Sequence, residues 1–337
     1  MTQTISTPLI GIIANSTSLV NRQDLVEELG EPHNGFFNSL KFKFKDMLGE
    51  IVPLDIQPND ILEKTGFETG KKAMFYAVKY LVEAGAKVIC FTASTKRLPG
   101  KLGQEIKKLY PEIIFTIGDN STMISFIALM NHFLSKLDKE NDAVACLGAG
   151  FLGEQAIGTF LKHGFKKVTL LSEQRVDCFP PGISVINSLE NLPRDLKFLA
   201  GCSHKYQINP KTFSTLFAEL AVIVDVCVPP VVNFDVYKAL PLGVSRYDAG
   251  DFYLRDVKYQ FKPSILRFPE PHFWYGCFTE AVMLNMAYQD GCKLSNYNFF
   301  EINSQNKELI NGYLKKEDVL VPVINFFNPI GQGTIPF

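Results

Sequence analysis

The chain has 337 residues with a formal net charge of −1, and 46% of them are hydrophobic and 20% charged. This composition predicts a globular protein of two or three domains, and the balanced charge argues against a general binder of nucleic acid or another polyanion. Seven cysteines without a CxxC pair, five scattered histidines, and no signal peptide or apolar stretch of membrane-spanning length predict a cytoplasmic protein without a metal site.

Residues 1–140 alternate between strand and helix patterns and are predicted to form an N-terminal α/β substrate domain. Strands are predicted at 9–14, 50–56, 87–92 and 113–117, and helices at 24–29 and 71–84, the second capped by Gly85. The alternating lysines and phenylalanines of 41–45 predict an exposed strand rather than a nucleic-acid patch. A turn at 118–122 precedes a long apolar helix to about Leu137, and the polar run 136–142 predicts the domain boundary.

A glycine-rich segment, Leu-Gly-Ala-Gly-Phe-Leu-Gly at 147–153, is the most informative part of the sequence. A strand pattern at 143–146 precedes it, and a helix pattern at 154–161 and a second strand pattern at 167–171 follow it. This order of strand, glycines, helix and strand is typical of a dinucleotide-binding unit. We therefore predict a Rossmann-type doubly wound parallel sheet over 141–260, with further buried strands at 196–200 and 221–228.

Each glycine of this motif has a predicted task in cofactor binding. Gly148 permits the tight turn, Gly150 lets the backbone approach a pyrophosphate, and Gly153 lets the helix pack close to the sheet. Phe151 and Leu152 lie within this glycine-rich run, and the free N–H groups of the first turn of the following helix face the phosphates. These residues are predicted to bind NADH or NADPH.

Three residues after the second strand bear on which nucleotide binds. Glu173 stands where an acid accepts a hydrogen bond from the ribose 2′-hydroxyl and favours NAD. Ser172 and Arg175 flank it, and together they are suited to hold a 2′-phosphate, which favours NADP. From the residues alone, both nucleotides stay open.

Residues 261–337 are predicted to form a C-terminal helical segment that lines the cleft between the two domains. A helix is predicted over 276–288, with Cys277 in its first turn, where the helix N-terminus lowers a thiol pKa. Glu280 shares a helical face with Cys277 and is a candidate to orient a donor or relay a proton. His272 is a candidate general acid. A buried structural cysteine and a surface histidine are the alternatives.

Almost from end to end, the chain resembles the long-chain acyl-acyl-carrier-protein reductase family, which forms fatty aldehydes. The segments that carry the resemblance are Leu9-Ile10-Gly11, Ser16-Thr17-Ser18-Leu19, 116–122, 148–153 and Val224-Asp225 with the later Asn233. The most specific match is 276–284, Gly-Cys-Phe-Thr-Glu-Ala-Val-Met-Leu, which is similar to the family's Cys-Phe-x-Glu-Ala-x-x-Leu segment.

The resemblance implies a two-step reduction by an NAD(P)H-dependent enzyme. Cys277, at the position of the family's acyl-carrying cysteine, would attack a thioester of acyl-carrier protein or of CoA. A nicotinamide, with NADPH favoured by the resemblance, would then deliver hydride and release an aldehyde. The implied partners are the thioester substrate and an enzyme that consumes the aldehyde.

Two other functions fit the same scaffold. A shikimate-dehydrogenase-like enzyme would pass hydride directly between NAD(P) and a small keto or hydroxy compound. It needs a Lys/Asp pair in the first region, which the sequence does not single out. A non-enzymatic dinucleotide-binding sensor or partner protein would keep Cys277 buried. Fold analogy alone does not choose among these functions.

Overall fold

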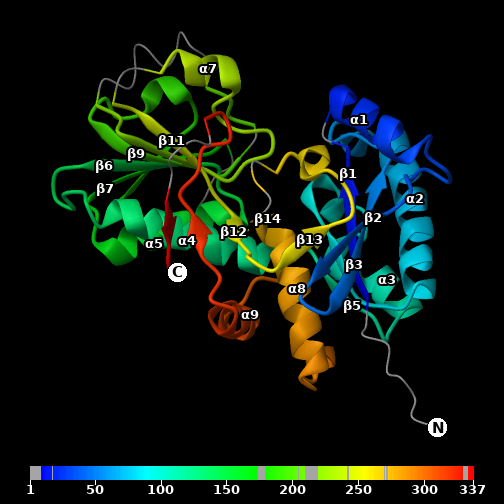
Figure 1. Cartoon of the computed structure of the whole chain (residues 1–337). Coiled ribbons are helices and arrows are strands. Elements are labelled where there is room, and N and C mark those ends of the chain that lie inside the picture. The colour runs from blue at the N-terminus through cyan, green and yellow to red at the C-terminus, as the bar shows by residue number, and fades with distance from the viewer. Residues whose placement is uncertain are drawn as a thin grey trace. The chain divides into compact units, whose positions relative to one another are not determined.

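The computed structural model describes residues 9–16, 18–173, 179–203, 205–208, 219–240, 243–268, 270, 272–328 and 333–337. The chain divides into two compact units (Figure 1). Unit 1 contains Met1–Thr122 and Phe252–Val319, and unit 2 contains Met123–Asp251 and Leu320–Phe337. Each unit is an α/β structure built around its own six-stranded sheet, and the predicted α/β class is confirmed.

The sheet of unit 1 has the strand order β13-β2-β3-β1-β4-β5. Its strands are β1 (Leu9–Asn15), β2 (Leu40–Phe44), β3 (Met47–Leu54), β4 (Ala86–Phe91), β5 (Ile114–Thr116) and β13 (Val257–Tyr259). Strands β3, β1, β4 and β5 are parallel, whereas β2 and β13 add an antiparallel edge. In β2, Phe42 and Phe44 are buried and Lys41 is exposed, so the predicted alternation is confirmed.

The helices of unit 1 differ in how they are buried. They are α1 (Leu19–Leu29), α2 (Lys64–Glu83), α3 (Gln104–Leu109), α8 (Gly276–Gln289) and α9 (Ser304–Lys316). Helix α2 buries one stripe, which includes Met74, Val78 and Leu81. Helix α8 is buried around most of its circumference and packs against β4 and β1, as an apolar helix inside a unit must. The helix predicted over 276–288 is confirmed.

The sheet of unit 2 has the order β11-β10-β9-β6-β7-β8, and all its neighbouring strands are parallel. Its strands are β6 (Ala143–Leu147), β7 (Lys167–Leu171), β8 (Ile183–Ile186), β9 (Leu196–Gly201), β10 (Val222–Asp225) and β11 (Ser245–Asp248). Counted from β6, this is the order 3-2-1-4-5-6 of a doubly wound Rossmann sheet, and α5 (Phe151–His163) joins its first two strands. The predicted Rossmann sheet is confirmed.

The remaining elements connect or complete these sheets. They are α4 (Asp119–Leu134), α7 (Phe234–Lys238), the paired strands β12 (Asp251–Tyr253) and β14 (Phe273–Tyr275), and the paired strands β15 (Val321–Pro322) and β16 (Thr334–Ile335). Short 3-10 helices lie at Asp60–Leu62, Ala93–Arg97, Lys101–Gly103, Leu189–Asn191, Pro263–Leu266 and Leu294–Asn296. Among the described residues, no helix has the length and apolar character of a membrane span.

A buried charged cluster joins the last strand of unit 2 to the C-terminal segment. Arg246 in β11 donates to Asp248 at 2.6 and 2.7 Å and to Asp225 at 3.2 Å. Asp248 also accepts a hydrogen bond from the N–H of Phe326 at 2.7 Å, and its own N–H donates to the carbonyl of Ile324 at 2.8 Å. Residues 320–337 are therefore a structural part of unit 2.

The two units differ from the predicted domains 1–140, 141–260 and 261–337. The first division falls inside α4, because Ser121 bonds to Gly276 within unit 1 whereas Phe133 stacks on Tyr247 within unit 2. The chain returns to unit 1 at residue 252, because β13 pairs with β2. Residues 261–337 are shared between the units rather than forming a segment of their own.

Candidate functional site

The glycine turn after β6 is closed on one side and open on the other. Gly148 has a φ of +105°, and a Cβ there would lie 2.5 Å from the Cβ of Ser203. A Cβ on Gly153 would overlap the carbonyl oxygen of Gly148. A Cβ on Gly150, in contrast, would meet no atom within 4 Å. Two glycines therefore permit close packing within the protein, and the third borders open space.

This turn lies at the carboxyl ends of the central strands of unit 2. The N–H of Gly148 donates to the carbonyl of Leu171 at 2.9 Å, and the N–H of Cys202 donates to that of Leu147 at 2.9 Å. These bonds join the ends of β6, β7 and β9 where the strand order reverses, the place at which open α/β sheets bind ligands. Helix α5 begins here with the half-exposed Phe151, followed by Leu152.

Of the three predicted specificity residues, Ser172 is buried and Glu173 is half-exposed. The Glu173 carboxylate forms an ion pair with Lys205. The backbone N–H of Glu173 donates a hydrogen bond to the hydroxyl of Tyr206 at 3.0 Å. Arg175 lies outside the described residues. Sequence reasoning missed Lys205 and Tyr206 because they follow Glu173 by 32 and 33 positions, with no local pattern to connect them.

In unit 1, Cys277 lies in the first turn of α8 and is partly exposed. It packs against the turn after β5. Gly118 in that turn has a φ of +72°, and a Cβ there would overlap the Cα and Cβ of Cys277. Only a glycine therefore lets α8 begin so close to the strand end. Behind it, the buried Cys90 of β4 donates its thiol to the carbonyl of Cys277 at 3.2 Å.

Glu280 connects α8 to the same turn. Its buried carboxylate accepts hydrogen bonds from the hydroxyl of Thr116, from the N–H of Ser121 at 2.8 Å and from the amide of Asn120 at 3.4 Å. Burial raises the pKa of Glu280 to about 7, and these donors oppose the rise. The carboxylate therefore supports the turn from inside unit 1 instead of sharing the exposed surface with the thiol.

The hydroxyl of Ser121 donates in return to the carbonyl of Gly276 at 2.5 Å. Sequence reasoning treated 116–122 and 276–284 as separate segments and did not foresee that they meet. The available signal was a glycine just after a strand, followed by polar residues, together with an acid one helical turn after the cysteine. The structure thus brings together two of the segments that carry the family resemblance, 116–122 and 276–284.

His272, the third predicted catalytic residue, directly precedes β14. Its carbonyl accepts a hydrogen bond from the N–H of Leu254 at 2.8 Å, and its ring lies 5.4 Å from that of Tyr253. The Nδ1 atom is buried and has no hydrogen-bond partner among the described residues. The general-acid role of His272 stays a prediction.

A Lys/Asp pair is present in unit 1 beside the Cys277 turn. Lys96 lies in the 3-10 helix after β4, and its Nζ is 3.1 Å from Oδ1 of Asp119. Asp119 is the first residue of α4 and directly follows Gly118. Both side chains keep some exposure, at 38% and 20%. The sequence could not single out this pair because its members follow different strands, 23 residues apart.

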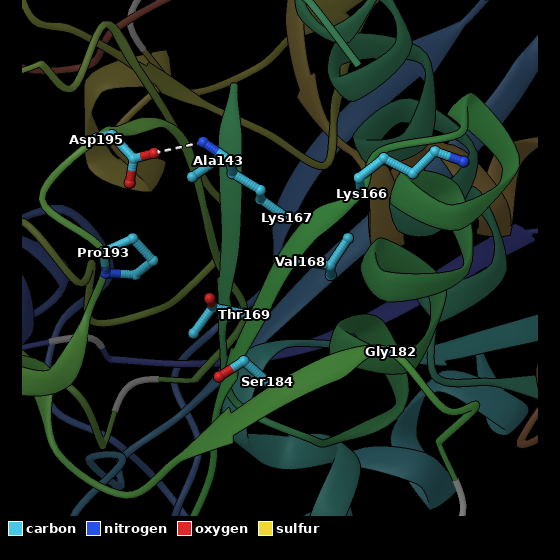
Figure 2. A pocket seen from close by; sticks show the side chains of 9 residues that line it. All are labelled: Ala143, Lys166, Lys167, Val168, Thr169, Gly182, Ser184, Pro193 and Asp195. Carbon is cyan, nitrogen blue, oxygen red and sulfur yellow. Dashed lines mark hydrogen bonds and ion pairs between the residues drawn. The ribbon is translucent and has the colours of Figure 1, made fainter. Parts of the chain in front are cut away.

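A surface pocket of about 260 Å³ lies at the opposite edge of the unit 2 sheet (Figure 2). It is formed at the amino ends of β6 and β7, beside the 2.8 Å ion pair between Lys167 and Asp195. No predicted site residue lines it, and ligands of parallel sheets bind at the carboxyl edge. Within the described part of the chain, no group of three or more His, Cys, Asp or Glu side chains is arranged to hold a metal ion.

No protein-family model matches the chain, and no curated protein matches it. Among solved structures, shikimate dehydrogenase 1 from Peptoclostridium difficile is 10% identical, with a TM-score of 0.41 over 90% of this chain and 97% of its own. A chorismate mutase/shikimate 5-dehydrogenase fusion protein from Clostridium acetobutylicum is 11% identical, with a TM-score of 0.37 over 93% of this chain and 99% of its own.

A D-isomer-specific 2-hydroxyacid dehydrogenase from Lactobacillus delbrueckii ssp. bulgaricus is 10% identical, with a TM-score of 0.34 over 91% of this chain and 96% of its own. All three are dehydrogenases by name, and none of the three is named as a reductase of acyl thioesters. The resemblance to the acyl-acyl-carrier-protein reductases therefore stays a prediction from the sequence.

Proposed function

We propose that the chain is an NAD(P)H-dependent oxidoreductase that reduces a thioester of acyl-carrier protein or of CoA to an aldehyde, with Cys277 as the nucleophile. The contact between Gly118 and Cys277 carries this proposal. A glycine with positive φ and the buried carboxylate of Glu280 hold the start of α8, where the residue Cys277 is partly exposed. A purely structural cysteine needs no such support, and Cys146 in β6 is simply buried.

The nucleotide is assigned to the glycine turn of unit 2. Gly148 and Gly153 bring α5 close to β6, and the open space at Gly150 leaves the backbone accessible to a pyrophosphate. The N–H groups at the start of α5, from Phe151 and Leu152, are the proposed donors. When bound there, a reduced nicotinamide supplies hydride.

Cys277 serves in both chemical steps. Its thiolate attacks the carbonyl carbon of the thioester, a new C–S bond forms, and the carrier leaves as a thiolate that takes up a proton. Once hydride has added to the acyl carbon, the bond to the Cys277 sulfur breaks, the sulfur keeps the electron pair, and the aldehyde leaves. The N-terminus of α8 stabilises negative charge on this sulfur. Aldehydes are reactive, so an aldehyde-consuming enzyme is the proposed partner.

Intact mass spectrometry tests the nucleophile without a nicotinamide. We expect the folded protein to gain one acyl group from an acyl-acyl-carrier-protein or acyl-CoA thioester, and Cys277→Ala to lose this adduct. Cys292→Ala is the matched control, because Cys292 is also partly exposed and lies just beyond the end of α8. An adduct that persists in Cys277→Ala, or no adduct on the wild-type protein, would contradict the proposal.

The Lys96–Asp119 ion pair favours a second candidate function. An ammonium and a carboxylate beside the carboxyl ends of β4 and β5 are suited to move a proton at a small keto or hydroxy compound during direct hydride transfer. Of the two candidates, this is the one that the names of the compared structures match. This second function predicts that the protein oxidises a hydroxy acid with NAD(P). This activity should be lost in Lys96→Met and unaffected in Cys277→Ala.

A further inference from the structure

An ion pair between Glu173 and Lys205 lies beside the glycine turn of unit 2. We propose that this pair selects the coenzyme: Glu173 makes NADH the preferred nucleotide, and Lys205 limits how strongly NADPH is rejected. The inference rests on the nucleotide binding proposed above, and it adds the identity of the coenzyme and the two residues that choose it.

Both the backbone and the side chain of Glu173 are bound by neighbouring residues. It follows the end of β7, the second strand of the Rossmann unit, where an acidic side chain meets the 2′-hydroxyl of the adenosine ribose. Its N–H donates to the hydroxyl of Tyr206 at 3.0 Å, and its carboxylate pairs with Lys205. The side chain nevertheless keeps 51% of its surface exposed. The carboxylate is therefore oriented by the protein and still accessible to a ligand.

The segment that holds Glu173 is itself anchored next to the glycine turn. Ser203 packs against Gly148, and its carbonyl accepts a hydrogen bond from the N–H of Tyr206 at 3.3 Å. The ring of Tyr206 packs against the apolar core of unit 2. Lys205 directly precedes the anchored Tyr206, and its ammonium pairs with the Glu173 carboxylate.

The two nucleotides differ in charge at this position. The ribose of NADH presents a 2′-hydroxyl that can donate to a carboxylate, whereas that of NADPH presents a phosphate with nearly two negative charges. Glu173 repels the phosphate, and Lys205 offsets part of this repulsion because an exposed ion pair exchanges partners at little cost. One unit charge a few ångströms away changes affinity by about tenfold. This reverses the NADPH preference that the family resemblance implies.

Calorimetric titration of the full-length protein with NADH and with NADPH tests the inference without any turnover. We expect the wild-type protein to bind NADH about tenfold more tightly. Glu173→Gln keeps the size of the side chain and removes its charge, so it should tighten NADPH binding about tenfold and change NADH binding little. Lys205→Met should weaken NADPH binding about tenfold and leave NADH binding nearly unchanged.

Lys167→Met is the matched control, because it removes a lysine from another exposed ion pair of unit 2, at the amino end of β7. It should leave both dissociation constants unchanged. If NADPH binds the wild-type protein as tightly as NADH, or if Glu173→Gln leaves their ratio unchanged, the assignment of Glu173 and Lys205 is wrong while nucleotide binding stands. If neither nucleotide binds the folded wild-type protein, the proposed function itself fails.

Discussion

Two strand ends in this molecule use glycine in opposite ways. Gly118 after β5 and Gly148 after β6 both have a positive φ, at +72° and +105°, and each precedes a helix. Side chains fill the space beside both glycines: Cys277 beside Gly118 and Ser203 beside Gly148. The turn of unit 2 has a further glycine, Gly150, whose space is open, so this turn leaves room for a ligand, whereas the turn of unit 1 positions a cysteine.

The largest effect on acylation is expected for Gly118→Ala, because the new Cβ combines an unfavourable φ with overlap on Cys277. We expect the free energy of unfolding to fall by about 2 kcal/mol, as measured in urea. Acylation of Cys277, followed by intact mass, should slow about 100-fold because the thiol is displaced. Gly85→Ala is the control: it has a φ of +96° and no atom within 4 Å of the new Cβ. Normal acylation in a folded Gly118→Ala protein would show that the turn at Gly118 does not position the Cys277 thiol for acylation.

Gly150→Val should weaken nucleotide binding and leave the stability of the protein nearly unchanged. Since a Cβ there meets no protein atom within 4 Å, the free energy of unfolding should change by less than about 1 kcal/mol. NADH binding should weaken at least tenfold, roughly 1.4 kcal/mol, while acylation of Cys277 continues. Gly158→Val in α5, which also borders open space, should leave the dissociation constant for NADH unchanged. Equal binding in Gly150→Val would show that the opening at this turn is not the nucleotide site.

The buried Glu280, which bonds to the turn after β5, makes the stability of the protein depend on pH. Its pKa is raised from 4.5 to about 7, so the folded protein retains a proton that the unfolded chain releases. The contribution of Glu280 to stability is therefore greatest below pH 4.5 and declines as pH rises toward 7, by roughly 3 kcal/mol in total. In Glu280→Gln, the free energy of unfolding measured between pH 5 and pH 8 should lose this decline. An identical pH profile in both proteins would contradict the burial effect.

The smallest effect is expected for Ser121→Ala, which removes a hydroxyl that donates to the carbonyl of Gly276 at 2.5 Å and to that of Gly118 at 3.3 Å. We expect a loss of about 1 kcal/mol in the free energy of unfolding and a fewfold slower acylation. Thr122→Ala is the comparison, because within the described part of the chain its hydroxyl donates to the carbonyl of Gly118 at 2.8 Å and not to α8. Acylation should stay at the wild-type rate in Thr122→Ala. If the two variants acylate equally slowly, the bond to α8 has no special part in placing the thiol.

Much of the fold was predictable because its strands are continuous apolar runs. β6 and β7, with the glycines between them, follow the pattern closely. Predictions failed where a side-chain hydrogen bond decides the boundary. The strand predicted over 221–228 ends at Asp225, because this carboxylate accepts hydrogen bonds from the N–H groups of Cys227 and Val231 and turns the chain away. The partly exposed β8, Ile-Ser-Val-Ile, is four residues long and was not predicted.

Helix starts were predicted less well than helix ends. The helix predicted to begin at residue 71 begins at Lys64, and its first turns contain Gly66 and Gly70, which are poor helix formers. Gly70 is tolerated because Ile56 and Leu98 occupy the space of its side chain. In the candidate site, local features were predictable and distant contacts were not. The glycine turn was predicted from its local sequence, whereas the bond from Thr116 to Glu280 spans 164 residues and no local pattern encodes it.

The return of residues 320–337 to unit 2 has a consequence for how the protein is made. A nascent chain emerges from its N-terminus, so Arg246 and Asp248 leave the ribosome well before Phe326 can cover them. In unit 1, the turn at Gly118 likewise needs α8, because Cys277 of this helix packs against it. Each unit therefore completes its core only when residues from the last part of the chain are available, and a shorter nascent chain should leave Asp248 without its bond to Phe326.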